Sequence, residues 1–160
     1  MLSIMDASSG DALLQVRTLF REYAASLGVD LCFQSFTEEL ATLPGAYSPP
    51  GGRLLLARWN QQPAGCVALR PLQHDICEMK RLYVRPAYRG FGVGRALAER
   101  IIGEAGDAGY ASMRLDSLPS MEKALQLYRR MGFRDVPPYR ENPVPGAVYL
   151  ELQLARQTTA

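Results

Sequence analysis

The chain has 160 residues, of which 48% are hydrophobic and 21% are charged, and its formal net charge is +2. This length predicts one domain, large enough to bury a core without disulfides or a metal. The net charge is too small to indicate nucleic-acid binding on its own, so any electrostatic function depends on a local cluster of charges.

The cysteines and the histidine are too few and too scattered for a zinc site. The chain carries Cys32, Cys66 and Cys77, with no C-x-x-C spacing, and the single histidine His74. Such cysteines fit buried thiols in a reducing compartment. No apolar run reaches the roughly 18 residues of a membrane span, and the start of the sequence lacks the features of a signal peptide. We therefore expect a cytoplasmic protein without a metal.

The first third of the chain predicts a strand followed by two helices. Residues 2–7 are typical of a short strand, and the apolar positions 13, 16, 20, 23 and 27 lie on one face of a helix. The segment "SFTEELATLPG" predicts a second, short helix that opens with a capping box, Ser35 and Glu38, and ends at Pro44 and Gly45. A loop rich in proline and glycine, "AYSPPGG", follows.

The rest of the chain predicts strands and helices in a mixed sheet. Residues 53–59, 64–72 and 74–84 predict three antiparallel strands, because the connections between them are short. Helices are predicted from Gly92 to Ala108, with Gly109 after its end, and over 120–132, with Ser120 as N-cap and Gly132 at its end. Strands are predicted over 111–117, 133–136 and 147–154. The order β-α-α-β-β-β-α-β-α-β-β predicts the α/β class.

Three glycines mark the entry to the helix that starts near residue 92. In "RGFGVGR", Gly90, Gly92 and Gly94 stand between Arg89 and Arg95. The first turn of a helix has unpaired N–H groups and a partial positive charge, and glycine lets a ligand approach the backbone closely. These features favour a phosphate site, to which Arg85 could add charge. A tight turn with solvated arginines is the alternative.

The glycine spacing does not match the common nucleotide motifs. No G-x-x-x-x-G-K-[ST] run exists, and the glycines recur at every second position rather than as G-x-G-x-x-G. Asp116 at a strand end could still act as a ribose-binding acid, so nucleotide binding stays open as an alternative.

The residues around the glycines resemble the GNAT acyltransferases. The run Arg89–Gly94 matches the acetyl-CoA signature of that family, and "LYVRPAY" precedes it in the usual manner. "SIMDASSGD" resembles the family's opening strand and turn, and "ALQLYRRMGF" resembles its later helix. The resemblance implies a single GNAT domain over residues 1–160. It also implies a mixed, mostly antiparallel sheet of about six to seven strands, splayed between strands 4 and 5, with about four flanking helices.

The same resemblance assigns a binding mode for acetyl-CoA as the acyl donor, with no metal. The pantetheine arm would pair with the backbone of Leu82, Tyr83 and Val84. The pyrophosphate would lie on the N–H groups of the glycine segment, which consists of Arg89, Gly90, Phe91, Gly92, Val93, Gly94 and Arg95.

Two residues are the main catalytic candidates. On the family resemblance, Tyr128 would donate a proton to the departing thiolate, although its place on an apolar helical stripe also fits a core residue. Glu78 lies in a run suited to burial, which would raise the pKa of its carboxyl and make it a general base. An ion pair between Glu78 and Lys80, simple exposure, or an ordered water acting as the base are the alternatives.

Weaker candidates stand beside them. His74 is more typical of a surface position, and Asp116 of a strand end. An acetyl-cysteine intermediate on Cys66 or Cys77 lacks a neighbouring base. The loop "PPYRENPVPG" either forms a wall of the acceptor site, with Tyr139 and Arg140 pointing inward, or only connects two strands.

These features together predict an N-acetyltransferase that moves an acetyl group directly to a primary amine of a small molecule, such as an amino acid or a polyamine. The alternatives are a protein or peptide N-acetyltransferase and a non-catalytic acyl-CoA-binding module. We expect no nucleic acid or membrane partner. A homodimer and a longer acyl chain stay open.

Overall fold

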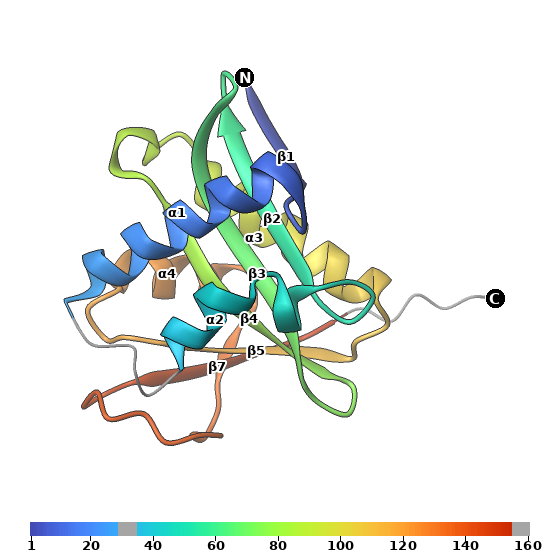
Figure 1. Ribbon diagram of the computed structural model, residues 1–160. Coiled ribbons are helices and arrows are strands. Elements are labelled where there is room, and N and C mark those ends of the chain that lie inside the picture. Colours follow the sequence, from blue (N-terminus) through green and yellow to red (C-terminus); the bar gives the residue numbers. More distant parts are fainter. Residues whose placement is uncertain (29–34, 155–160) are drawn as a thin grey trace.

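The computed structural model describes residues 1–28 and 35–154, and its centre is a seven-stranded sheet (Figure 1). The spatial order of the strands is β1-β2-β3-β4-β5-β7-β6. Neighbouring strands are antiparallel, except for the parallel pair β4 and β5. The strands are β1 (Leu2–Asp6), β2 (Arg53–Trp59), β3 (Gln62–Gln73), β4 (Ile76–Val84), β5 (Ser112–Ser117), β6 (Arg134–Asp135) and β7 (Val148–Gln153).

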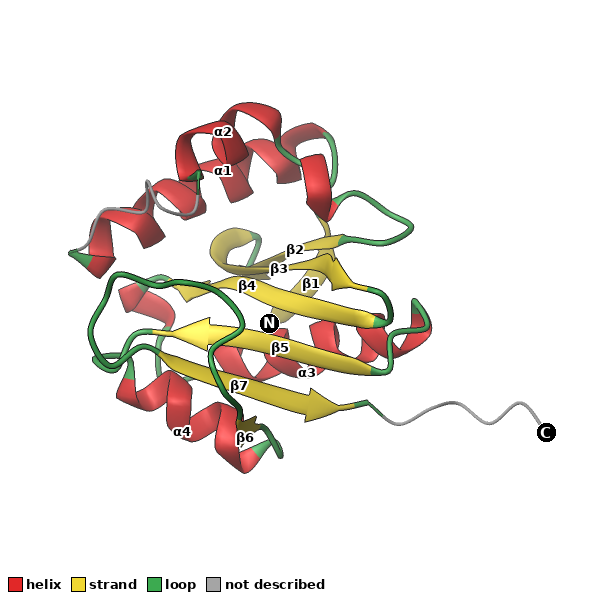
Figure 2. Cartoon of the chain, turned by 90° about the horizontal axis from the view of Figure 1, so that it is seen from below, coloured by secondary structure: helices red, strands yellow, loops and turns green. Residues whose placement is uncertain are grey.

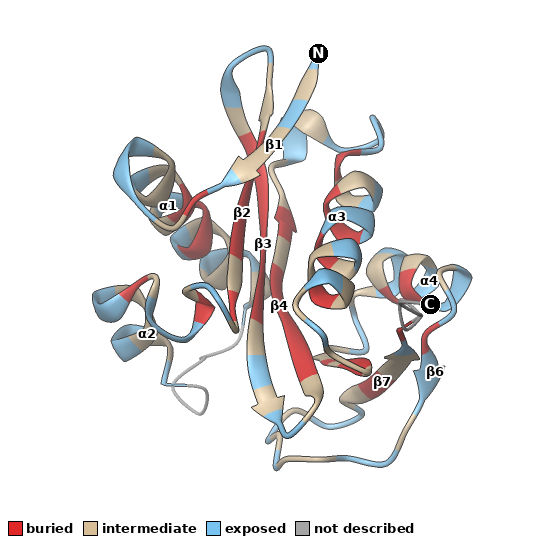
Figure 3. Cartoon of the chain, turned by 90° about the vertical axis from the view of Figure 1, so that its right-hand side faces the viewer, coloured by how far each residue is buried: buried red, intermediate tan, exposed pale blue. Residues whose placement is uncertain are grey.

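Helices cover both faces of the sheet (Figure 2). They are α1 (Gly10–Leu27), α2 (Phe36–Thr42), α3 (Val93–Asp107) and α4 (Glu122–Arg130). α1 and α2 lie on one face, and α3 and α4 lie on the other. Side chains alternate along a strand, so the sheet contributes to two buried clusters, one under each pair of helices (Figure 3). No helix in the two described ranges has the length and apolar character needed to cross a bilayer.

The observed order of strands and helices confirms the predicted order and the α/β class, but two helix starts differ. Ser35 has φ 54°, in the left-handed region, and makes no capping bond. An N-cap side chain needs an extended backbone to reach the first N–H groups, so the predicted capping box is wrong. α4 has Met121 rather than Ser120 as its N-cap. Met121 N–H donates to Leu118 C=O (3.0 Å) in a turn that precedes the helix, so α4 begins after Met121.

The predicted splay between the fourth and fifth strands is confirmed. β4 pairs with β5 only over Ile76–Glu78, opposite Ser112–Arg114. In the rest of β4, Met79, Lys80, Tyr83 and Val84 have their ladder partners on β3. Beyond Glu78 the edge of β4 therefore separates from β5 inside the sheet, where an extended ligand can bind to it.

A β-bulge changes the direction of side chains along this edge. Ala68 of β3 pairs with Lys80 while Cys66 pairs with Tyr83, so β4 holds an additional residue at Arg81, which has φ 61°. Met79 and Leu82 both pack in the cluster under α3, and the two residues between them break the alternation. The bulge thus places charged side chains beside the open end of β4.

Candidate active site

A pocket lies where β4 and β5 separate. β4 forms one wall and the end of β5 forms the other, while α1 and α4 each add one tyrosine. The pocket is lined by Tyr23, Met79, Lys80, Arg81, Leu82, Leu115, Asp116, Ser117, Met121 and Tyr128. Because strand β4 forms one wall, a ligand in this pocket can contact both main-chain groups and ionisable side chains.

The glycine segment lies beyond the end of β4 and opens α3. Gly90 and Gly92 have φ 85° and 83°, values that favour glycine. The first helical bond is from Ala96 N–H to Gly92 C=O (3.0 Å), so the N–H groups of residues 93–95 precede the helical hydrogen-bond ladder. A Cβ atom added at Gly90 or Gly92 would meet no atom within 4 Å. The segment therefore combines available donors with open space, as an anion site requires.

The three arginines near this segment have different partners. Arg89 donates from Nε to Val84 C=O (2.9 Å), and Arg95 forms a surface pair with Glu99 (2.8 Å). A surface pair of this kind contributes little stability, so Glu99 holds the Arg95 side chain only weakly. Arg85 is bound to Glu22 of α1 (2.7 Å). The suggestion that Arg85 assists the phosphate site is therefore not supported by its contacts.

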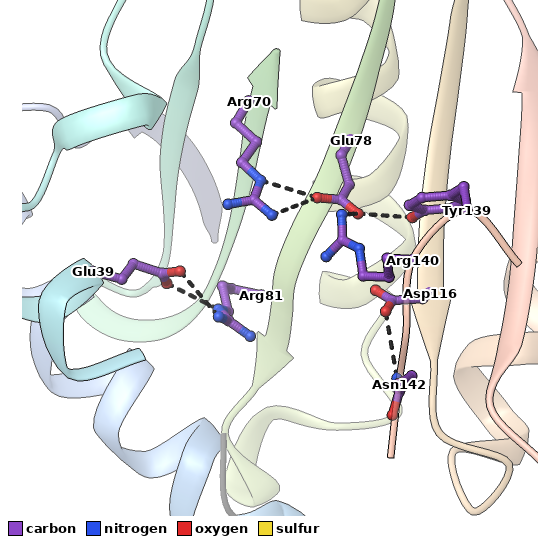
Figure 4. A network of polar contacts seen from close by, with 8 residues as sticks. All are labelled: Glu39, Arg70, Glu78, Arg81, Asp116, Tyr139, Arg140 and Asn142. Atoms are coloured by element: carbon purple, nitrogen blue, oxygen red, sulfur yellow. Dashed lines mark hydrogen bonds and ion pairs between the residues drawn. The ribbon is translucent and has the colours of Figure 1, made fainter. Parts of the chain in front are cut away.

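Glu78 is fully buried and receives bonds from three side chains (Figure 4). Arg70 donates from Nε to Oε1 (2.9 Å) and also forms an ion pair with it through Nη2 (2.9 Å), and Tyr139 donates to Oε2 (2.7 Å). Arg140 also donates to Oε2. Burial alone would raise the pKa of Glu78, but the charges of Lys80, Arg140 and Arg70 outweigh it, and the pKa is lowered.

The expected raised pKa of Glu78 is therefore wrong, because Lys80 and the two arginines together favour the charged carboxylate. A carboxylate held by two guanidinium groups keeps its negative charge and accepts a proton poorly. Sequence reasoning missed Arg70, although the hairpin register places it directly opposite Glu78. Tyr139 and Arg140 point inward, which agrees with the loop acting as a wall of the site.

Two further polar contacts on this face were not predicted from the sequence. Arg81 binds Glu39 of α2 through two bonds of 2.9 and 3.0 Å, and its side chain is 2% exposed. Asn142 donates to Asp116 (3.5 Å), again from the loop before β7. Each pair joins segments far apart in the sequence, so no local pattern indicates it.

Tyr128 belongs to both the core and the pocket. It is 6% exposed and packs against Phe133 with ring centroids 5.6 Å apart, and it also lines the pocket. Burial raises its pKa well above the usual value, so the hydroxyl keeps its proton at neutral pH. Its position is compatible with a proton donor, and its catalytic role stays a prediction. His74 is exposed at the turn between β3 and β4, outside the pocket.

The described cysteines are poor nucleophiles. Cys66 and Cys77 are free and buried, and Cys32 lies outside the described residues. Burial raises the pKa of both thiols, that of Cys77 to about 12. Because the thiolate is the reactive form, neither side chain is activated for attack on a thioester.

We accordingly expect no acetyl-cysteine intermediate. Acetyl-CoA added without an acceptor should leave the intact mass of the protein unchanged. Mild acid quenching followed by mass spectrometry checks this, with the same protein after chemical S-acetylation as the positive control. A stoichiometric gain of one acetyl group on a cysteine would contradict direct transfer.

Comparison with known proteins agrees with this geometry. Residues 14–133 match the family described as "Acetyltransferase (GNAT) family". An uncharacterized N-acetyltransferase of Schizosaccharomyces pombe is 42% identical over 142 residues, covering 88% of this chain and 87% of that protein. An IAA acetyltransferase of Azospirillum brasilense is 35% identical, covering 66% of this chain and 70% of that protein.

A solved structure shares the fold. A Salmonella typhimurium protein, determined with its cofactor acetyl-CoA, aligns with a TM-score of 0.72 at 21% identity, covering 99% of this chain and 96% of that protein. The chain belongs to the GNAT family and is an N-acetyltransferase that uses an acyl-CoA donor.

Proposed function

We propose that this enzyme transfers an acetyl group directly from acetyl-CoA to a primary amine of a small molecule. The observation that supports this most strongly is the pocket between β4 and β5, which has Tyr128 in its wall and the glycine segment beyond the end of β4. Donor recognition and a proton donor are thus close to the same opening in the sheet.

The donor is held mainly by main-chain groups. The backbone of Leu82, Tyr83 and Val84 pairs with the amides of the pantetheine arm, as an added strand would. The pyrophosphate lies on the N–H groups between Arg89 and Arg95. The thioester then enters the pocket, and Tyr128 gives its proton to the departing thiolate. Glu78, which sequence reasoning made the base, is proposed to position Arg70, Tyr139 and Arg140.

The acceptor side favours a small amine over a protein segment. Tyr139 and Arg140 donate hydrogen bonds to Glu78 and so hold the loop before β7 against this face of the sheet. A loop held there leaves less room for a large acceptor such as a protein segment. One relative is named for acetylation of IAA, and a relative from Sus scrofa is a thialysine N-epsilon-acetyltransferase, 36% identical over 58 residues. The free thiols of Cys66 and Cys77 support a cytoplasmic location.

A thiol-release screen tests this function. The purified chain is mixed with acetyl-CoA and with amino acids, polyamines, aminoglycosides or peptides with free N-termini, and the release of CoA is followed. We expect at least one small amine to release thiol in proportion to the acetylated product. Release with peptides alone would favour the protein acetyltransferase, and binding without release would favour the acyl-CoA-binding module.

Gly92→Val is expected to weaken acetyl-CoA binding by about 100-fold or more, the worth of roughly two charge-assisted hydrogen bonds. The added side chain would extend into the open space beside the proposed pyrophosphate site. Gly109→Val is the matched control, because Gly109 has φ 91°, has equal space, and lies at the other end of α3. Calorimetry on both folded variants measures the effect, and equal affinities would rule out the phosphate site.

A further inference from the structure

The pocket holds a lysine in a chain that otherwise uses arginine. Of 18 basic residues, two are lysines, Lys80 and Lys123, and the others are arginines. Lys123 is exposed on α4, whereas Lys80 on β4 is only 5% exposed. An arginine cannot lose its proton in a protein, but a buried lysine can. Lys80 is therefore a cation of this pocket able to exchange a proton.

Lys80 lies in the pocket where, in the proposed reaction, the acceptor amine must lose a proton. It lines the pocket together with Tyr128 of α4 and Leu82, whose backbone is part of the proposed pantetheine site. It directly precedes the bulge at Arg81, which sets it beside the open part of β4. The acceptor nitrogen must reach the thioester carbon in this pocket, so it must come close to Lys80.

The charges around Lys80 act in opposite directions. Burial, the largest influence, lowers its pKa, and Arg81 and Arg70 lower it further, while Glu78 and Asp116 raise it. The result is a pKa of about 8. A lysine with a lowered pKa has a larger uncharged fraction near neutral pH than an ordinary lysine, whose pKa lies near 10.4.

Asp116 of β5 also lines the pocket and accepts a hydrogen bond from Asn142 (3.5 Å), and the tyrosines and glutamates on this face do not compete for the role. Tyr23 of α1 and Tyr128 of α4 line the pocket, and burial raises the pKa of both, so they stay protonated. Glu39 of α2 is bound to Arg81. Glu78 is bound to two arginines and has a lowered pKa.

We propose that Lys80 is the general base that takes a proton from the ammonium form of the acceptor. This inference rests on the proposed transfer to an amine. The uncharged Lys80 amine accepts one proton, and the neutral acceptor nitrogen forms a bond to the carbonyl carbon of the thioester. The C–S bond then breaks, and the thiolate takes the proton of Tyr128. The nitrogen of the new amide returns its extra proton to Tyr128, and Lys80 releases the first proton to solvent.

Kinetics of Lys80→Met and Lys80→Arg test the role. With the best amine from the thiol-release screen, both variants should lose roughly 10²- to 10⁴-fold in kcat/KM. The fall of kcat/KM below about pH 8, which reports the protonation of Lys80, should be absent in both variants. Hydroxylamine is the second acceptor, because its nitrogen is already unprotonated at neutral pH, and transfer to it should change only a few-fold. Lys123→Met is the matched control and should keep the rate with both acceptors.

Full activity of Lys80→Arg would overturn the proposal, since arginine keeps the charge but cannot accept the proton. An equal loss with hydroxylamine would overturn it as well. So would stoichiometric acetylation of Lys80 by acetyl-CoA alone, because Lys80 would then be an acceptor.

Nuclear magnetic resonance of protein labelled with [ε-¹³C]lysine separates this proposal from the proposed function. The chain gives two lysine signals, which Lys123→Met assigns. A titration midpoint near pH 8 for Lys80 supports the proposal, and a midpoint equal to that of Lys123 overturns it. A screen that finds no acceptor at all would contradict the proposed function instead, while the titration still reports on Lys80.

Discussion

Tyr128→Phe is expected to lower turnover by roughly 10²- to 10⁴-fold, the usual effect of losing a positioned proton donor. The ring packs against Phe133 in the core, and the variant keeps that ring, so stability and acetyl-CoA affinity should hold. Pre-steady-state thiol release measures the chemical step directly. Because only an oxygen atom is removed, a fall in rate separates catalysis from packing.

Tyr110→Phe is the matched control for this experiment. Tyr110 is partly buried, and its hydroxyl donates to Gly51 C=O (2.6 Å), away from the pocket. This variant should lose about 1 kcal/mol of stability and keep its turnover. If Tyr128→Phe retained full turnover while acetyl transfer limits the rate, Tyr128 would be a structural residue.

Glu78→Gln is expected to lower the free energy of unfolding by about 3 kcal/mol, because it leaves two arginines without their common carboxylate. Urea denaturation measures the loss. Glu104→Gln is the control: Glu104 also binds two arginines, Arg53 and Arg100, but at the surface of α3, where about 1 kcal/mol or less is expected. Equal losses of stability in the two variants would contradict the claim that burial makes the loss of the Glu78 carboxylate more costly.

The pH dependence of Glu78 follows from the direction of its shift. Its pKa is lowered in the folded state, so its contribution to stability is present above the unfolded value near 4.5 and is lost as the pH falls through the lower folded value. In the Glu78→Gln variant, the free energy of unfolding should therefore not show this part of the decrease at acidic pH. In the pH dependence of kcat/KM, the acidic limb of the Glu78→Gln variant should lie at lower pH, since Glu78 raises the pKa of Lys80. Complete loss of the limb would make Glu78 the base.

The sequence predicted the elements well because their signals are local. The glycines before α3, the turn glycines and the apolar periodicities depend on residues a few positions apart, and they located helices and strands to within a few residues. The helix start at Met121 was missed because a preceding turn, rather than the available serine, determines it.

The charge network could not be predicted in the same way. Glu78 meets Tyr139 and Arg140 across more than 60 residues of sequence, and Arg81 meets Glu39 across 42. Burial was correctly expected for Glu78, but the sign of its pKa shift depends on these distant cations. Only the contact with Arg70 was accessible in principle, through the register of the β3–β4 hairpin.

The short joint between β4 and β5 has a consequence for how this protein can diversify. Three residue pairs connect the two parts of the sheet, and beyond them main-chain groups of β4 face the gap. Recognition by main-chain groups depends on the path of the backbone and hardly on the identity of the side chains. In the proposed binding mode, pocket residues outside β4, such as Tyr23 of α1 and Asp116 of β5, can therefore be exchanged for others while the donor is still held. A new acceptor then requires substitutions only among such residues.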